Sequence, residues 1–210
     1  MPSIKLSSLA IVLGSLMVLL GAAGLFKPAA FAAAARRFPR FTPVGYVLML
    51  LGTCWFVYNL AHESIADFAS FKPLLYGLFL AVGLGTCVFV RDFLPVRGLA
   101  VVLLLAAKLM TDTARWIETE WRLVITVWAY VWILAGMWFT VSPWRMRDLL
   151  NWSVATPTRT RLLSGLRCGF GVLVVVLGVT VYPKFEQHKS LFDELQEREN
   201  AALSGAAERP

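Results

Sequence analysis

Long apolar runs dominate the chain, and short polar segments separate them. Each run approaches the roughly 20 residues that an α-helix needs to cross about 30 Å of hydrocarbon. No stretch alternates apolar and polar residues over the length of a barrel strand, and backbone amides in lipid must bond within their own segment, so helices are expected. The pattern predicts an all-α, polytopic transmembrane helical bundle of about six spans. These spans are residues 8–26, 44–61, 73–90, 95–112, 122–142 and 162–182.

The spans assign residues 1–182 to a transmembrane bundle and leave residues 183–210 as a polar tail, which we expect to be partly disordered. Residues 8–26 are too long for the apolar region of a signal peptide. We therefore interpret them as a retained first helix.

Lysine and arginine residues concentrate in the connections that follow the first, third and fifth spans. These connections and their membrane edges hold eleven: Lys27, Arg36, Arg37, Arg40, Arg91, Arg97, Arg145, Arg147, Arg159, Arg161 and Arg167. The opposite side holds Lys5, Lys72, Lys108, Arg115 and Arg122 before the tail. Because cytoplasmic loops carry the excess of positive charge, we expect the three connections to face the cytoplasm and both termini to lie outside it.

Residues 106–122, AAKLMTDTARWIETEWR, place charged side chains between two nearly uninterrupted apolar runs. One continuous helix over residues 98–142 would be about 67 Å long and would leave one of these runs in water. A reversal is therefore predicted near residues 116–119. Thr119 is the predicted N-cap of the next helix, with Glu120 in its first turn.

Three of these charges, Lys108, Asp112 and Arg115, form a candidate polar cluster near the end of the fourth span. In one interpretation Lys108 extends to the outer interface and pairs with Asp112 one helical turn away. In the other, the cluster faces the bundle interior and forms part of a polar pathway or ligand site, since ionisable groups inside membranes are functional candidates.

A Pro-aromatic-basic pattern recurs between spans. An apolar span ends at Pro28 and again at Pro143, basic residues follow, and Thr-Pro opens the next span at residues 42–43 and 156–157. The segment RDFLPVRG at residues 91–98 is a shorter version. This recurrence predicts three helical hairpins whose tips all face the cytoplasm, as a parallel repeat. Chance recurrence of proline at membrane boundaries is the alternative.

The first and last of these hairpins resemble short, uncharacterised two-helix proteins of bacterial inner membranes, a family without assigned chemistry. The middle hairpin departs from that pattern. The resemblance implies a location in a bacterial inner (plasma) membrane and implies no catalytic activity.

Small residues repeat on one face of several spans, where they favour close contact between helices in lipid. These residues are Ala10, Gly14, Gly21 and Gly24 in the first span, Gly77, Ala81 and Gly85 in the third, and Gly171 and Gly178 in the sixth. We expect each set to form a seam within the bundle.

Aromatic residues form a stripe on the fifth span, at Trp121, Trp128, Trp132 and Phe139. The stripe is interpreted either as core or lipid-facing packing, or as a docking face for a partner subunit or a flat hydrophobic cofactor.

Composition narrows the classes of function. Hydrophobic residues make up 58% of the chain, and the mean hydropathy is +0.67, which is typical of a membrane protein. The net charge of +7 lies in short connections and forms no continuous stripe, so nucleic acid is not an expected partner. Cys54, Cys87 and Cys168 form no CxxC pair and are expected to be small buried packing residues.

Catalytic and metal-binding patterns are weak throughout the sequence. His62 and His188 match no ligand spacing, and the sequence contains no nucleophile elbow or phosphate loop. We expect no cofactor and no catalytic site. The leading hypothesis is a non-enzymatic structural, accessory or assembly subunit that lies in the lipid bilayer with a membrane-protein partner or a second copy. The alternative is a small transporter or channel that uses Lys108, Asp112 and Arg115.

Overall fold

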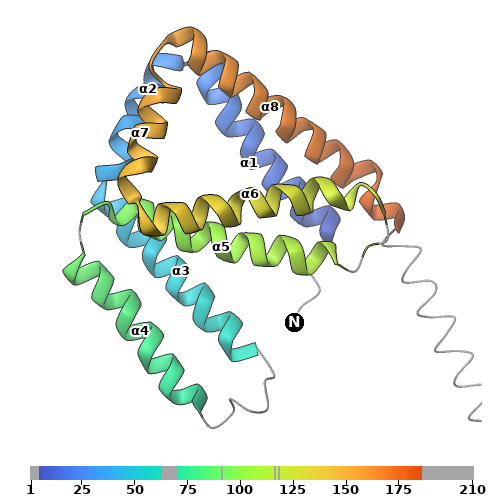
Figure 1. Cartoon of the computed structure of the whole chain (residues 1–210). Coiled ribbons are helices and arrows are strands. Elements are labelled where there is room, and N and C mark those ends of the chain that lie inside the picture. Colours follow the sequence, from blue (N-terminus) through green and yellow to red (C-terminus); the bar gives the residue numbers. More distant parts are fainter. Residues whose placement is uncertain (1–4, 63–70, 91, 116, 118, 186–210) are drawn as a thin grey trace, which may run out of the picture.

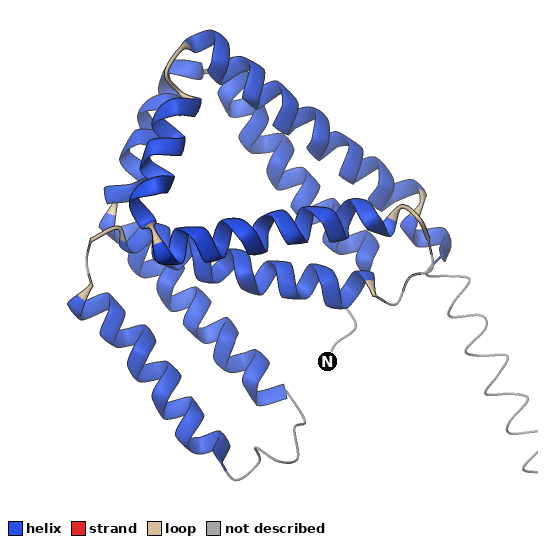
Figure 2. Ribbon diagram, in the orientation of Figure 1, coloured by secondary structure: helices blue, strands red, loops and turns tan. Residues whose placement is uncertain are grey.

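The computed structural model describes residues 5–62, 71–90, 92–115, 117 and 119–185, and every regular element within these ranges is helical (Figures 1 and 2). The elements are α1 (Leu6–Phe26), α2 (Pro28–Arg37), the 3₁₀ helix η1 (Phe38–Arg40), α3 (Thr42–His62), α4 (Lys72–Phe89), α5 (Leu94–Ala114), α6 (Arg122–Val141), α7 (Pro143–Ser153) and α8 (Pro157–Thr180).

Six of the described helices, α1, α3, α4, α5, α6 and α8, are long and apolar enough to cross a membrane. Their bounds lie close to the six predicted spans, so the predicted helical membrane bundle is confirmed. The predicted reversal after the fourth span is also confirmed, since α5 ends at Ala114 and α6 begins at Arg122. Most of the predicted tail lies outside the described residues.

The prediction that Thr119 caps α6 is wrong. The N-cap residue is Trp121, which makes no side-chain capping bond. Thr119 instead contributes its backbone carbonyl, which accepts from the Arg122 amide at 3.2 Å. The turn is thus held by the backbone.

Two of the connections that the sequence pattern treats as basic loops are helices. The chain leaves the helical conformation at Lys27 (φ −129°, ψ 63°) and, in nearly the same way, at Ser142 (φ −131°, ψ 75°). Pro28 and Pro143 then start α2 and α7 in a new direction, because a proline at the first helical position has its φ already set and loses no bonded amide.

Four of the long helices form two pairs, α1 with α8 and α5 with α6, and the two pairs converge at one end and diverge at the other (Figure 1). The pair α1 and α8 and the pair α5 and α6 converge around a shared core that includes Leu6, Met110, Ile125, Val174 and Tyr182. At the opposite end, α7 connects α6 to α8, and α2, which leads from α1 to η1 and α3, lies beside it. Helix α3 packs on α5, and α4 packs on α3.

This pairing differs from the three predicted hairpins. The main contacts join α1 with α8, α3 with α5, α5 with α6, and α3 with α4, whereas helices that share a basic connection are not among the main pairs. For the first and last predicted hairpins, the lengths of α2 and α7, 10 and 11 residues, give the reason. Each is about 15 Å long, which exceeds the roughly 8–10 Å between the axes of packed helices, so the next long helix begins too far away to pack on the previous one.

The predicted small-residue seams of α1 and α8 are confirmed, because the two faces pack on each other. A Cβ atom added at Gly14 would lie 2.9 Å from the Gly171 carbonyl oxygen, and one added at Gly21 would lie 2.8 Å from the Ser164 carbonyl oxygen. At Gly178 the corresponding distance, to the Ser7 oxygen, is 3.1 Å. The two backbones therefore approach so closely that side chains larger than hydrogen do not fit.

The predicted seam of α4 is wrong. A Cβ atom added at Gly77 would meet no atom of the described residues within 4 Å, and Ala81 is exposed. Helix α4 contacts α3 through its other face, where Gly83 lies against Thr53 and Cys87 is buried. The two faces carry small residues at similar spacing, and the sequence does not distinguish them.

Candidate functional site

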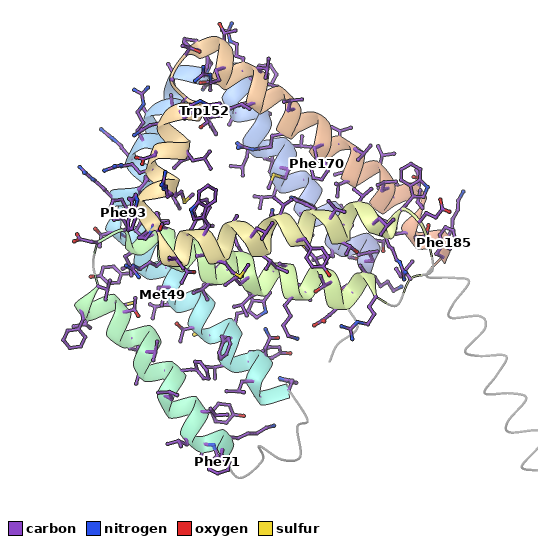
Figure 3. The ribbon with its side chains drawn as sticks, viewed as in Figure 1. Met49, Phe71, Phe93, Trp152, Phe170 and Phe185 are labelled. Carbon is purple, nitrogen blue, oxygen red and sulfur yellow. The ribbon has the colours of Figure 1, made fainter. Side chains whose placement is uncertain are left out.

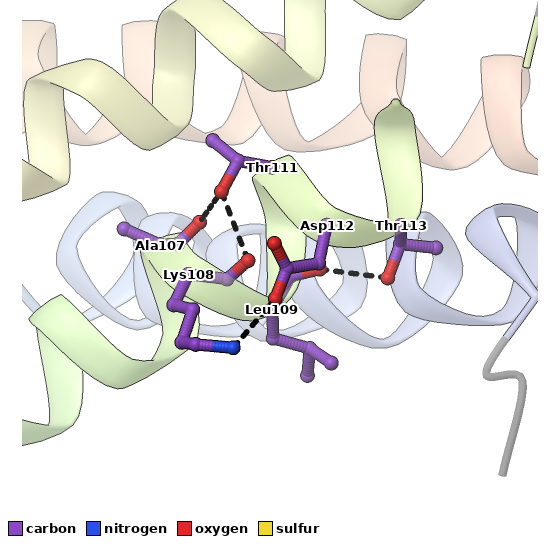
Figure 4. Close-up of polar contacts among 6 residues, drawn as sticks. All are labelled: Ala107, Lys108, Leu109, Thr111, Asp112 and Thr113. Atoms are coloured by element: carbon purple, nitrogen blue, oxygen red, sulfur yellow. Dashed lines mark hydrogen bonds and ion pairs between the residues drawn. The ribbon is translucent and has the colours of Figure 1, made fainter. Parts of the chain in front are cut away.

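Two residues of the predicted polar cluster, Lys108 and Asp112, form an ion pair on α5 (Figure 4). The Lys108 Nζ atom lies 2.8 Å from Asp112 Oδ2, and the two side chains are 43% and 41% exposed. Arg115 is the exposed C-cap residue of α5 and, among the described residues, takes no part in this ion pair. The structure therefore brings together two members of the predicted triad.

The position of the pair favours the interfacial interpretation. Asp112 lies two residues, and Lys108 six residues, before the last residue of α5, which places them about 3 and 9 Å from the helix end. Neighbouring hydroxyls bond within the same helix: Thr111 donates to the carbonyl of Ala107 and Thr113 to that of Leu109, at 3.0 and 2.7 Å. The polar groups thus satisfy one another along the surface of one helix.

The aromatic stripe of α6 divides between core and surface. Trp128 and Phe139 are only 8% and 7% exposed, and Trp128 makes edge contacts with Trp132 and Phe170 at centroid distances of 5.1 and 5.0 Å. Figure 3 shows Phe170 on the side of α8 that faces α6. Trp121 is exposed, and its carbonyl accepts from the buried Tyr182 hydroxyl at 3.0 Å. Trp128 and Phe139 therefore lie in the core of the chain, Trp132 is half-buried, and Trp121 lies at the surface.

An apolar pocket of about 420 Å³ lies beside Trp128, between α6 and α8. It is lined by Leu123, Val124, Val127, Trp128, Val131 and Phe170. Its lining contains no charged side chain to orient a ligand, so its chemistry suits a hydrocarbon chain.

We call the layer formed by α2, η1, α7 and the start of α8 the basic layer. Arginine side chains bond to backbone carbonyls at the end of α7 and so connect its helices. Arg36 of α2 donates from Nη2 to the carbonyl oxygen of Val154, the C-cap residue of α7, at 3.1 Å. Arg159 of α8 donates to the Trp152 carbonyl at 3.2 Å, and its guanidinium lies 4.9 Å from the centre of the Trp152 ring. Positive groups at a helix C-terminus satisfy its last carbonyls and favour the helix dipole.

The basic layer contains a polar pocket of about 380 Å³ between α2, η1 and α7. We call it the arginine pocket, and its lining residues are Arg36, Pro39, Arg40, Arg147, Asp148 and Asn151. Arg147 donates to Asp148 Oδ1 from two nitrogens, at 2.9 and 3.1 Å. Sequence reasoning did not find this pocket, because its members come from two segments that are far apart in the chain.

The cysteines and histidines provide little chemistry. Cys87 is buried as expected and Cys168 is half-buried, but the expectation that Cys54 is buried is wrong, because its side chain is exposed on α3. His62 is the last residue of α3, and its Nδ1 lies 2.9 Å from the Tyr58 carbonyl oxygen. His188 lies outside the described residues.

No protein-family model, curated protein or solved structure matches this sequence.

Proposed function

We propose that this multi-pass membrane protein is a non-enzymatic accessory or assembly subunit of a bacterial inner membrane. Its partner would be another membrane protein, which contacts it through α4. The observation that carries the proposal is the exposure of α4, which packs on α3 through one face and is otherwise the least buried of the long helices.

Helix α4 is the least buried of the six long helices. Only 11% of its apolar window is buried, compared with 22% to 50% for the other five. The face opposite its contact with α3 carries Gly77, Ala81 and Gly85, and a Cβ atom added at Gly77 would meet nothing within 4 Å. Close backbone approach through small residues favours helix association in lipid. This face therefore suits a transmembrane helix of a partner subunit.

The ion pair of α5 supports this role over transport. A polar pathway needs charged groups between helices, whereas Lys108 and Asp112 pair along the exposed surface of a single helix. An accessory role needs no such pathway.

Site-specific photo-crosslinking in cells tests the proposal. A photoreactive amino acid at Ala81 should give one discrete protein adduct, whereas the same group at Val179, an exposed position on α8, should give none. An adduct with the mass of two copies would show that the partner is a second copy of this chain and not a different subunit. The absence of any adduct, together with solute flux in liposomes that Asp112→Asn abolishes, would overturn the proposal in favour of a transporter.

We also propose that the basic layer faces the cytoplasm and that both termini lie outside it. The eleven lysines and arginines of the alternate connections support this orientation. A reporter enzyme fused after Pro210 provides the test. Activity of a reporter that works only in the cytoplasm would contradict the orientation.

A further inference from the structure

The arginine pocket gathers positive charge from two distant parts of the chain. Arg36 and Arg40 come from α2 and η1, and Arg147 comes from α7. The pocket lining thus contains three guanidinium groups and one carboxylate, a formal excess of two positive charges.

Within the pocket, one carboxylate neutralises one of the three guanidinium groups, and the remaining positive charge is available to bind an anion. Asp148 neutralises Arg147 through two hydrogen bonds to one carboxylate oxygen. Arg36 is held by the Val154 carbonyl, which occupies one of its donors without neutralising its charge. The Asn151 side chain adds amide donors to the same lining.

The orientation of the protein in the membrane does not require this convergence. The positive-inside preference needs basic residues on one side, but it does not need them to share a cavity. Here the hydrogen bond from Arg36 to Val154 joins positions that are 118 residues apart in sequence and fixes α2 against α7. The pocket is therefore a product of the fold.

We infer that the arginine pocket binds a phosphate group. The planar guanidinium fork matches the oxygen atoms of a phosphate and forms paired, charge-assisted hydrogen bonds with them. A phospholipid headgroup and a soluble phosphate compound share this chemistry. The exposed tryptophans of α7 favour the headgroup, because Trp144 and Trp152 are 48% and 55% exposed and tryptophan is enriched at membrane interfaces.

Calorimetric titration of the full-length protein in detergent micelles tests the inference, with short-chain phosphatidic acid and inorganic phosphate as separate probes. Arg40→Gln should weaken phosphatidic acid binding about tenfold because it removes a charge-assisted contact. Arg147→Gln should weaken it about as much because it leaves the Asp148 carboxylate without its positive partner in the pocket. Arg37→Gln and Arg161→Gln remove the same charge from exposed positions outside the pocket. They should change the affinity by less than about twofold.

The results distinguish binding in the arginine pocket from a general attraction of the anionic lipid to arginines on the protein surface. Equal losses in all four variants, or no binding of either probe, would overturn the inference. Competition by inorganic phosphate would identify a soluble phosphate compound as the ligand, and binding of phosphatidic acid without competition would identify a headgroup. Asp148→Asn provides a second measurement should the arginine variants fail to fold. It removes the negative charge of the pocket and should strengthen binding, so unchanged affinity would also overturn the inference.

Discussion

Replacement of Gly21 by alanine should separate α1 from α8. The added Cβ atom would lie 2.8 Å from each of three atoms: the Cβ and the backbone nitrogen of Cys168 and the carbonyl oxygen of Ser164. Two of these belong to the backbone and cannot rotate away. Ordinary contacts between such atoms begin near 3.5 Å, so α8 would have to move by about 0.7 Å.

The size of the effect follows from two opposing contributions. Overpacking in a closely packed seam costs about 1–3 kcal/mol. Alanine in place of glycine favours a helix by up to about 1 kcal/mol. Gly77→Ala makes the same chemical change on α4, where the added atom meets nothing within 4 Å. Because the propensity gain is common to both variants, the difference between them isolates the overpacking, and we expect Gly21→Ala to be less stable than Gly77→Ala by about 1–3 kcal/mol.

Reversible unfolding in mixed micelles, followed by the fluorescence of the eight tryptophans, measures this difference. Gly21→Ala should unfold at a lower concentration of the denaturing detergent than the parent protein, and Gly77→Ala at the same or a higher one. Equal stabilities of the two variants would refute the close approach of α1 and α8.

Three further predictions concern the other surfaces. A double-mutant cycle of Lys108→Leu and Asp112→Asn should give a coupling free energy of only about 0.3–0.5 kcal/mol in detergent; a single variant that fails to fold while the double variant is rescued would contradict the surface position of the pair. Ala81→Leu should leave the melting temperature of the isolated protein unchanged, because this face of α4 is open; a large decrease would restore the predicted seam. Arg36→Gln should speed amide hydrogen exchange in α7, because the Val154 carbonyl loses a charged donor worth about 1.5–3 kcal/mol. Exchange as slow as in the parent protein would show that other contacts hold this helix.

The spans were predictable because length and hydropathy alone decide them. Every polar backbone group in hydrocarbon must be bonded within its helix, so an apolar run of sufficient length has one stable structure. The helix that starts at Pro28 was missed, although the segment PAAFAAAARR contains a signal for it, a proline before a run of strong helix formers. The arginines of that segment also fit a basic cytoplasmic loop, so the charge pattern alone does not distinguish a helix from a loop here.

The basic layer was less predictable, because its contacts join side chains to distant backbone carbonyls. Arg36 bonds to Val154, and Arg159 to Trp152. A carbonyl acceptor has no sequence signature, since every residue carries one. The arrangement of α2 against α7 is therefore visible only in three dimensions, and so is the arginine pocket between them.

The two small-residue faces of α1 and α4 show where sequence reasoning about membrane helices stops. Both spacings allow close packing, yet among the described residues only the face of α1 is used, where Gly14 and Gly21 meet the backbone of α8. A small residue allows another helix to pack closely but does not determine which helix packs there, because lipid and protein present equally apolar surfaces. On α1 the choice follows from α8, whose own glycine Gly171 faces the same seam. On α4 the face of Gly77 has no matching glycine among the described helices, and the same physics leaves it open to a helix from another chain.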